Sequence, residues 1–177
     1  MHENLSTWQR MPWIRERLIS RPRMSFAHSL VCRPSTSGEV LVLANCEVDI
    51  PQASNAAAVA IPSDYTVSKI IEKRVRLHFN NSGEIEIEGF NIHFAVSVGG
   101  PCPLVYVCVA EPRISSERAQ EFLLADALLA NSQLLERFST AGDHDLQQQI
   151  QPVLQELMNR VELRALKQDH ASSIRFL

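Results

Sequence analysis

The chain has 177 residues, of which 45% are hydrophobic and 21% are charged, and its formal net charge is −3. This composition is typical of one globular domain and excludes a chain that is disordered throughout. Apolar runs such as residues 40–44 and 104–110 are much shorter than the roughly 20 residues that a transmembrane helix needs.

The charge is unevenly distributed along the chain. Residues 1–37 contain six arginines and two glutamates, a net charge of +4, so the remaining residues carry −7. An acidic body does not attract a phosphate backbone, and nucleic acid is therefore excluded as a partner on bulk electrostatics. We interpret residues 1–38, with their prolines and few acidic residues, as a weakly ordered extension. Their Arg and Ser content also matches a mitochondrial presequence.

Four cysteines are present, and none forms a CxxC pair. Cys46 and Cys108 lie within apolar runs, which favours buried free thiols over disulfides. His28 and Cys32 are spaced like half of a zinc site, but no second pair has ligand spacing. The sequence therefore predicts neither a metal site nor a cofactor.

The first predicted elements are a strand and an amphipathic helix. Residues 40–44 form a continuous apolar run, as expected for a strand buried on both faces. Residues 46–61 lack a clear pattern and are open to a short strand or an irregular edge. Ser63 is the expected N-cap of a helix that ends at the turn residues 80–83. Its apolar face consists of Val67, Ile70, Ile71 and Val75, and its polar face includes Lys69 and Lys73.

Three strands are predicted next. Residues 84–88 alternate strictly, which places Ile85 and Ile87 inward and three glutamates in water, as in an exposed or edge strand. Residues 90–98 also alternate, with His93 on the polar side, where a surface histidine is expected. Residues 104–110 are apolar on both faces, so we expect this strand to lie beside residues 40–44 at the centre of the sheet.

Beyond Pro112, the apolar residues recur at the spacing of α-helices. One helix is expected from Ser115 or Ser116 to about Gly142, and another from about residue 146 to 163, with Pro152 at its first turn or at a kink. Residues 164–177 are interpreted as a C-terminal tail. This order of elements predicts an α+β domain with a mainly antiparallel sheet. No nucleotide-binding, metalloprotease or hydrolase motif occurs, so we do not expect an enzyme.

A string of segments is similar, in order and spacing, to a longin domain, the N-terminal module of long vesicle-associated R-SNAREs. It comprises the strand and helix above, Asn80-Asn81, the hairpin with Gly89-Phe90-Asn91-Ile92-His93-Phe94, residues 104–110 and residues 117–123. The resemblance covers about residues 39–163. It implies a profilin-like α-β-α sandwich, with a five-stranded sheet, one helix on one face and two on the other.

The same resemblance implies a non-catalytic interaction module of membrane trafficking, cytoplasmic and peripheral to endomembranes. The expected partner is a SNARE motif or a trafficking adaptor or coat protein, and membranes are reached only through partners. Since few residues follow the last helix, we expect no SNARE motif or membrane anchor in this chain, as in a truncated R-SNARE or in phytolongins. A scaffold subunit of an adaptor or tethering complex, longin-like or roadblock-like, and an imported mitochondrial protein are the alternatives.

By analogy with longins, the partner is expected between the first helix and the edge strand. The groove residues would be Val67, Ile70, Ile71, Val75, Ile85 and Ile87, with Lys69 and Lys73 on the rim. The free backbone groups of an edge strand can pair with an added strand, which favours this position.

Overall fold

The structure is a computed structural model that describes residues 26–48, 60–112, 114–129 and 132–174. Its strands are β1 (Phe26–Pro34), β2 (Val40–Glu47), β3 (Asn81–Ile87), β4 (Phe90–Ser97) and β5 (Leu104–Ala110). Its helices are α2 (Asp64–Arg74), α3 (Ser116–Leu129), α4 (Ser132–Phe138) and α5 (Gln147–Ile174).

The five strands form one sheet in the order β2-β1-β5-β4-β3, and all neighbouring strands are antiparallel. The predicted α+β class and the five-stranded antiparallel sheet are therefore confirmed. The alternating strand that contains Ile85 and Ile87 is an edge strand, also as predicted.

The predicted boundary at residue 39 is wrong. Residues 26–34 form β1, which lies inside the sheet between β2 and β5. Strand β1 has no clear hydropathy pattern because it buries two polar residues, His28 and Ser29, and because its pairing register with β2 shifts between Val31 and Cys32. Its insertion also separates β2 from β5, so the two apolar strands that we expected to be neighbours are not. The rest of the predicted extension, residues 1–25, lies outside the described residues.

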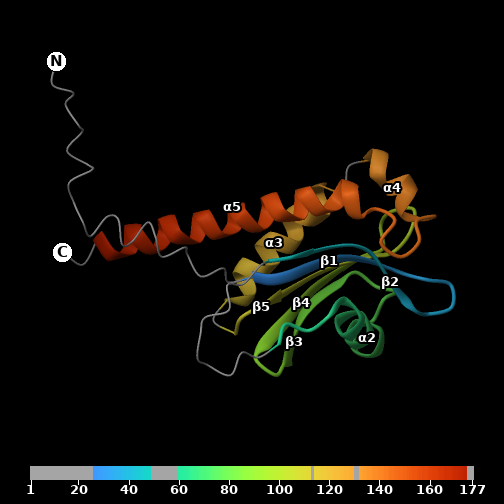
Figure 1. Ribbon diagram of the computed structural model, residues 1–177, viewed down its shortest axis with the longest axis horizontal. Helices are drawn as coiled ribbons and strands as arrows, with labels where there is room; N and C mark the ends of the chain where they lie inside the picture. The colour runs from blue at the N-terminus through green and yellow to red at the C-terminus, as the bar shows by residue number, and fades with distance from the viewer. Residues whose placement is uncertain (1–25, 49–59, 113, 130–131, 175–177) are drawn as a thin grey trace, which may run out of the picture.

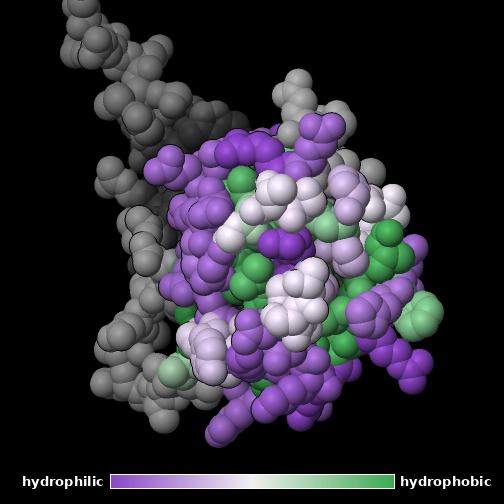
Figure 2. Space-filling model, turned by 90° about the vertical axis from the view of Figure 1, so that its right-hand side faces the viewer, coloured by the Kyte–Doolittle hydropathy of each residue, from purple (hydrophilic) through white to green (hydrophobic). Residues whose placement is uncertain are grey.

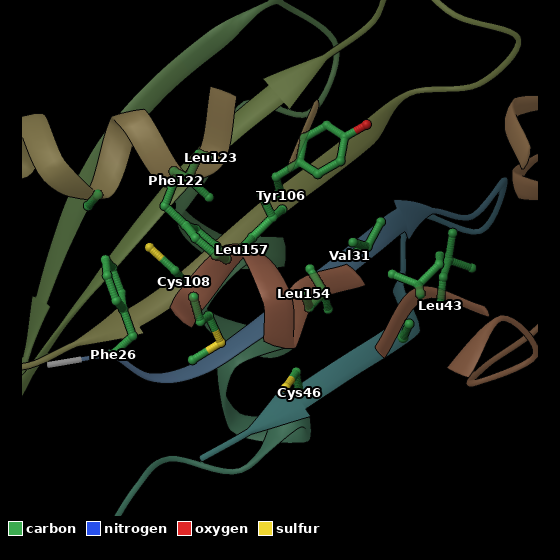
Figure 3. Close-up of a cluster of buried hydrophobic side chains, with 14 of the residues drawn as sticks. Phe26, Val31, Leu43, Cys46, Tyr106, Cys108, Phe122, Leu123, Leu154 and Leu157 are labelled. Atoms are coloured by element: carbon green, nitrogen blue, oxygen red, sulfur yellow. The ribbon is translucent and has the colours of Figure 1, made fainter. Parts of the chain in front are cut away.

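Helix α5 lies on one side of the sheet and α2 on the other (Figure 1), and a hydrophobic cluster lies on each side. Alternate residues of β5 point to opposite faces: Tyr106 and Cys108 join one cluster, whereas Val105 and Val107 join the other. The first cluster contains residues of α3 and α5 and is drawn in Figure 3, where Phe122 of α3 and Leu154 of α5 approach the same strands. The second cluster contains the buried face of α2.

Three helix boundaries differ from the predictions. Helix α2 begins after the expected N-cap Ser63, whose hydroxyl accepts a bond from Thr66 N–H, but it ends at Arg74 because Val75 is already extended. The predicted helix from Ser115 or Ser116 to about Gly142 is two helices, α3 and α4. Helix α5 begins at Gln147, which places Pro152 inside it, and it continues to Ile174, beyond the boundary predicted at residue 163.

Among the described helices, none combines the length and the apolar composition needed to span a bilayer.

Candidate functional site

A cluster of polar side chains lies where β1, β2 and the first turn of α2 meet. His28 of β1 is fully buried, and its Nε2 atom is 2.7 Å from Oδ1 of Asp64, the first residue of α2. This distance is short enough for a hydrogen bond, but the two groups are not aligned to form one. Neither ring nitrogen of His28 has a hydrogen-bond partner among the described residues. A buried polar atom without a partner is costly, so this position requires an explanation.

The Asp64 carboxylate has partners from three elements. Its other oxygen, Oδ2, accepts a hydrogen bond from Asn45 Nδ2 of β2 and lies 3.8 Å from Nε2 of His144, in the loop before α5. Burial by itself raises the pKa of Asp64, but His28, Asn45 and His144 together outweigh it, so the pKa is lowered from its usual value. Asp64 is thus a carboxylate at neutral pH, as the N-terminus of a helix also favours.

His28 and Asp64, together with Glu47 of β2, form a set of side chains of the kind that bind metal ions. It is the only such set among the residues that the structure describes. Oxygen or nitrogen atoms of His28, Glu47 and Asp64 lie within 4.8 Å of one another. Glu47 is directly opposite His28 in the pairing of β1 with β2, and its side chain is exposed. The expectation of no metal site missed this set because its members are far apart in sequence and His28 was assigned to the extension.

The loop before α5 covers the outer edge of β2. The backbone N–H groups of His144 and Leu146 donate to the carbonyls of Val42 and Leu43, over 2.7 and 3.2 Å. The Val42 N–H donates to Oδ1 of Asp143 over 3.0 Å. His144 has a positive φ of 58°, a conformation that few residues other than glycine adopt and that allows this close approach. One of the two sheet edges is therefore occupied by the chain itself.

The other edge is formed by β3. Among the described residues, no loop or helix is joined to the outer edge of β3 by backbone hydrogen bonds. Ile87, at its end, remains half-buried, and Glu86 is exposed. Unpaired strand groups of this kind are the usual template for an added strand.

The predicted groove residues lie together, but most of them are core residues. All six belong to or pack against the cluster under α2. Val67 and Ile71 are fully buried and Val75 and Ile85 nearly so, whereas Ile70 and Ile87 keep part of their surface exposed.

Two large hydrophobic side chains that the sequence analysis did not single out are on the surface. Tyr65 of α2 is 71% exposed, and Phe79, between α2 and β3, is 66% exposed. The predicted rim residue Lys69 donates to Glu72 over 2.9 Å, and its Nζ lies 5.9 Å from the centre of the Tyr65 ring. Lys73, the second rim residue, is exposed.

Figure 2 shows the end of the molecule that lies to the right in Figure 1. On this face, hydrophobic side chains reach the surface in small groups between hydrophilic ones.

A second polar group occupies the other side of the sheet, and it corrects two interpretations. His93 is fully buried instead of being a surface histidine, and it lies across from Cys108 in the pairing of β4 with β5. Glu84 is not simply solvated: it accepts hydrogen bonds from Asn91 Nδ2 and Ser116 Oγ, and its Oε2 is 3.7 Å from Nδ1 of His93. Burial lowers the pKa of His93, against a weaker opposite effect of Glu84, so the ring is neutral at pH 7.

None of the four cysteines forms a disulfide, as predicted. Burial raises the pKa of Cys32, and the charges of Asp64 and Asp143 raise it further. Burial likewise raises the pKa of Cys46 and of Cys102. These three thiols are protonated at neutral pH and are poor nucleophiles.

No protein-family model matches this chain, and no curated protein matches it either.

Proposed function

We propose that the chain is a non-catalytic protein-interaction module of vesicle-mediated membrane trafficking, similar to a longin domain. Its partner is a SNARE motif or a trafficking adaptor or coat protein, and it works on the cytoplasmic side, peripheral to endomembranes. The proposal rests on the sequence resemblance, and the antiparallel five-stranded sheet is compatible with it.

The observation that carries the proposal is the difference between the two sheet edges. The edge of β2 is hydrogen-bonded by the loop before α5, whereas β3 carries no such cover among the described residues. A peptide that adds to β3 would gain main-chain hydrogen bonds and would contact Ile87. Phe79, exposed just before β3, adds apolar area beside that edge.

Charge supports a partner that is acidic where it faces α2. Lys73, Arg74 and Arg76 are exposed at the end of α2 and just beyond it. Charges on such a rim chiefly increase the rate of association and fix orientation. A non-catalytic role agrees with the raised pKa values of Cys32, Cys46 and Cys102.

The test is an NMR titration of the ¹⁵N-labelled full chain with synthetic SNARE-motif peptides that contain acidic stretches. We expect the amide signals of β3 and α2 to shift on binding. The double variant Lys69→Glu, Lys73→Glu should bind more slowly, most clearly at low salt. Its Tm should change by only about a degree or two, because the Lys69–Glu72 pair is partly exposed to solvent and such pairs contribute little to stability.

The matched control reverses two arginines on α5. Arg160 and Arg164 each pair with a glutamate, as Lys69 does, and both are exposed. Arg160→Glu, Arg164→Glu should leave association unchanged. Shifts confined to α3 and α5, or equal effects of both double variants, would contradict the proposed position of the partner.

A further inference from the structure

We propose that His28, Glu47 and Asp64 form a binding site for one divalent transition-metal ion, with Zn²⁺ as the best-matched ion. The three residues supply one imidazole nitrogen and two carboxylate groups from β1, β2 and α2. Imidazole selects zinc-like ions over Mg²⁺ and Ca²⁺, which prefer oxygen ligands alone.

The environment of His28 favours a bound cation. Its side chain is completely buried, yet Nδ1 and Nε2 have no hydrogen-bond partner among the described residues. A cation placed between His28 and the carboxylates of Glu47 and Asp64 would give Nε2 a partner. Coordination would thus lower the cost of burying this ring, since one of its two unpartnered nitrogens becomes a metal ligand.

The distance between His28 and Asp64 is close to the distance between two ligands of a zinc ion. Ligands about 2.0–2.2 Å from a zinc ion are about 3.0–3.4 Å apart at octahedral to tetrahedral angles. The Nε2 atom of His28 and Oδ1 of Asp64 are 2.7 Å apart, so an opening of less than about 1 Å admits the ion. A carboxylate oxygen of Glu47 lies within 4.8 Å of one ligand atom of His28 and one of Asp64.

A neighbouring side chain orients the Asp64 carboxylate, and the site can be reached from solvent. Asn45 Nδ2 donates to Oδ2 of Asp64 and leaves Oδ1 turned toward His28, which is how outer hydrogen bonds commonly orient a ligating carboxylate. Glu47 is exposed and the Asp64 side chain is 17% exposed, so an ion can enter from solvent on their side. His144, close to Asp64 Oδ2, offers a further nitrogen donor.

A metal here would act as a clamp. It would fix the first turn of α2 to the two strands at the β2 end of the sheet. Binding to the folded chain alone would stabilise it by mass action.

The test measures Zn²⁺ binding to the full chain by isothermal titration calorimetry, with Mg²⁺ as a comparison ion. We expect one Zn²⁺ per chain, a higher Tm with Zn²⁺, and no Mg²⁺ binding of similar strength. Glu47→Gln should weaken Zn²⁺ binding about tenfold or more. Because Glu47 is exposed, this variant should fold as the parent chain does.

The matched control is Glu86→Gln, the same change at an exposed position on β3, at the opposite edge of the sheet. It should leave the affinity for Zn²⁺ unchanged. A readout that needs no variant is the imidazole ¹⁵N spectrum of the parent chain, in which Zn²⁺ should shift Nε2 of His28. The proposal would be overturned if Zn²⁺ bound with a Kd weaker than about 100 μM, or if both variants lost the same affinity for Zn²⁺. Zn²⁺ binding that leaves the ¹⁵N signals of the His28 ring unshifted would also overturn it.

Discussion

The side-chain amide of Gln147 bonds both backbone groups of Asn45. The Asn45 N–H donates to Oε1 of Gln147 over 2.9 Å, and Nε2 donates to the Asn45 carbonyl over 2.8 Å. The first residue of α5 therefore occupies the place of a strand residue beside β2. Together with the His144 and Leu146 backbone bonds, it explains why one edge of the sheet is closed.

We expect Gln147→Ala to lower the free energy of unfolding by about 1–3 kcal/mol, because it removes two hydrogen bonds and leaves part-buried backbone groups unpaired. Urea unfolding followed by circular dichroism measures the change. Gln148→Ala, at the neighbouring exposed position, should stay within about 0.5 kcal/mol of the parent chain. Equal effects of the two substitutions would show that the Gln147 amide does not hold the β2 edge.

The helical layer on the α3 and α5 side depends on large aromatic side chains. Phe122 is fully buried, and its ring centre lies 5.3 Å from that of Phe26 on β1. Phe122→Ala should cost about 3–5 kcal/mol, since it leaves a cavity in a packed core. Phe79→Ala makes the same chemical change at a side chain that is 66% exposed, and it should cost less than about 1 kcal/mol. Similar losses for the two variants in denaturant unfolding would contradict the burial of Phe122 between α3 and the sheet.

Hydropathy period alone predicted the strands that alternate or are apolar throughout. Residues 84–88 alternate because one face packs under α2 and the other meets solvent, and residues 104–110 are apolar because helices cover both faces of β5. These constraints act on every residue of the segment, so they are visible in the sequence.

β1 was missed because its buried polar residues lie against groups that are distant in sequence. His28 meets Asp64, and the Ser29 hydroxyl donates to Sδ of Met158, 129 residues away. Neither partner is near in sequence, so buried polar residues looked like those of an exposed tail. The candidate metal site was missed for the same reason, since its three residues come together only after β1 pairs with β2.

Localisation separates the proposed trafficking role from the mitochondrial alternative. A fluorescent protein fused to the C-terminus of the full chain should appear on the cytoplasmic side of endomembranes, where a SNARE or coat partner resides. Arrival in the mitochondrial matrix with loss of N-terminal residues that precede β1 would instead favour an Arg-rich presequence. Protease protection of the fusion in isolated organelles distinguishes the two compartments.

His93 should make stability depend on pH in the mildly acidic range. Burial lowers the pKa of its imidazole below the ordinary value of 6.5, and the nearby charge of Glu84 only partly offsets that effect. Above pH 6.5 the ring is neutral in both the folded and the unfolded chain. As the pH falls below 6.5, the unfolded chain takes up the proton first, so the free energy of unfolding decreases by up to about 1.4 kcal/mol per pH unit until the folded pKa is reached.

Urea unfolding between pH 7.5 and 5 measures this slope. His93→Gln removes the titrating group while keeping a polar side chain, so its stability should change less between pH 6.5 and 5 than that of the parent chain, whatever its absolute value. His78→Gln is the control, because it makes the same change at an exposed histidine. A parent slope that survives in His93→Gln and disappears in His78→Gln would show that His93 is not the group responsible.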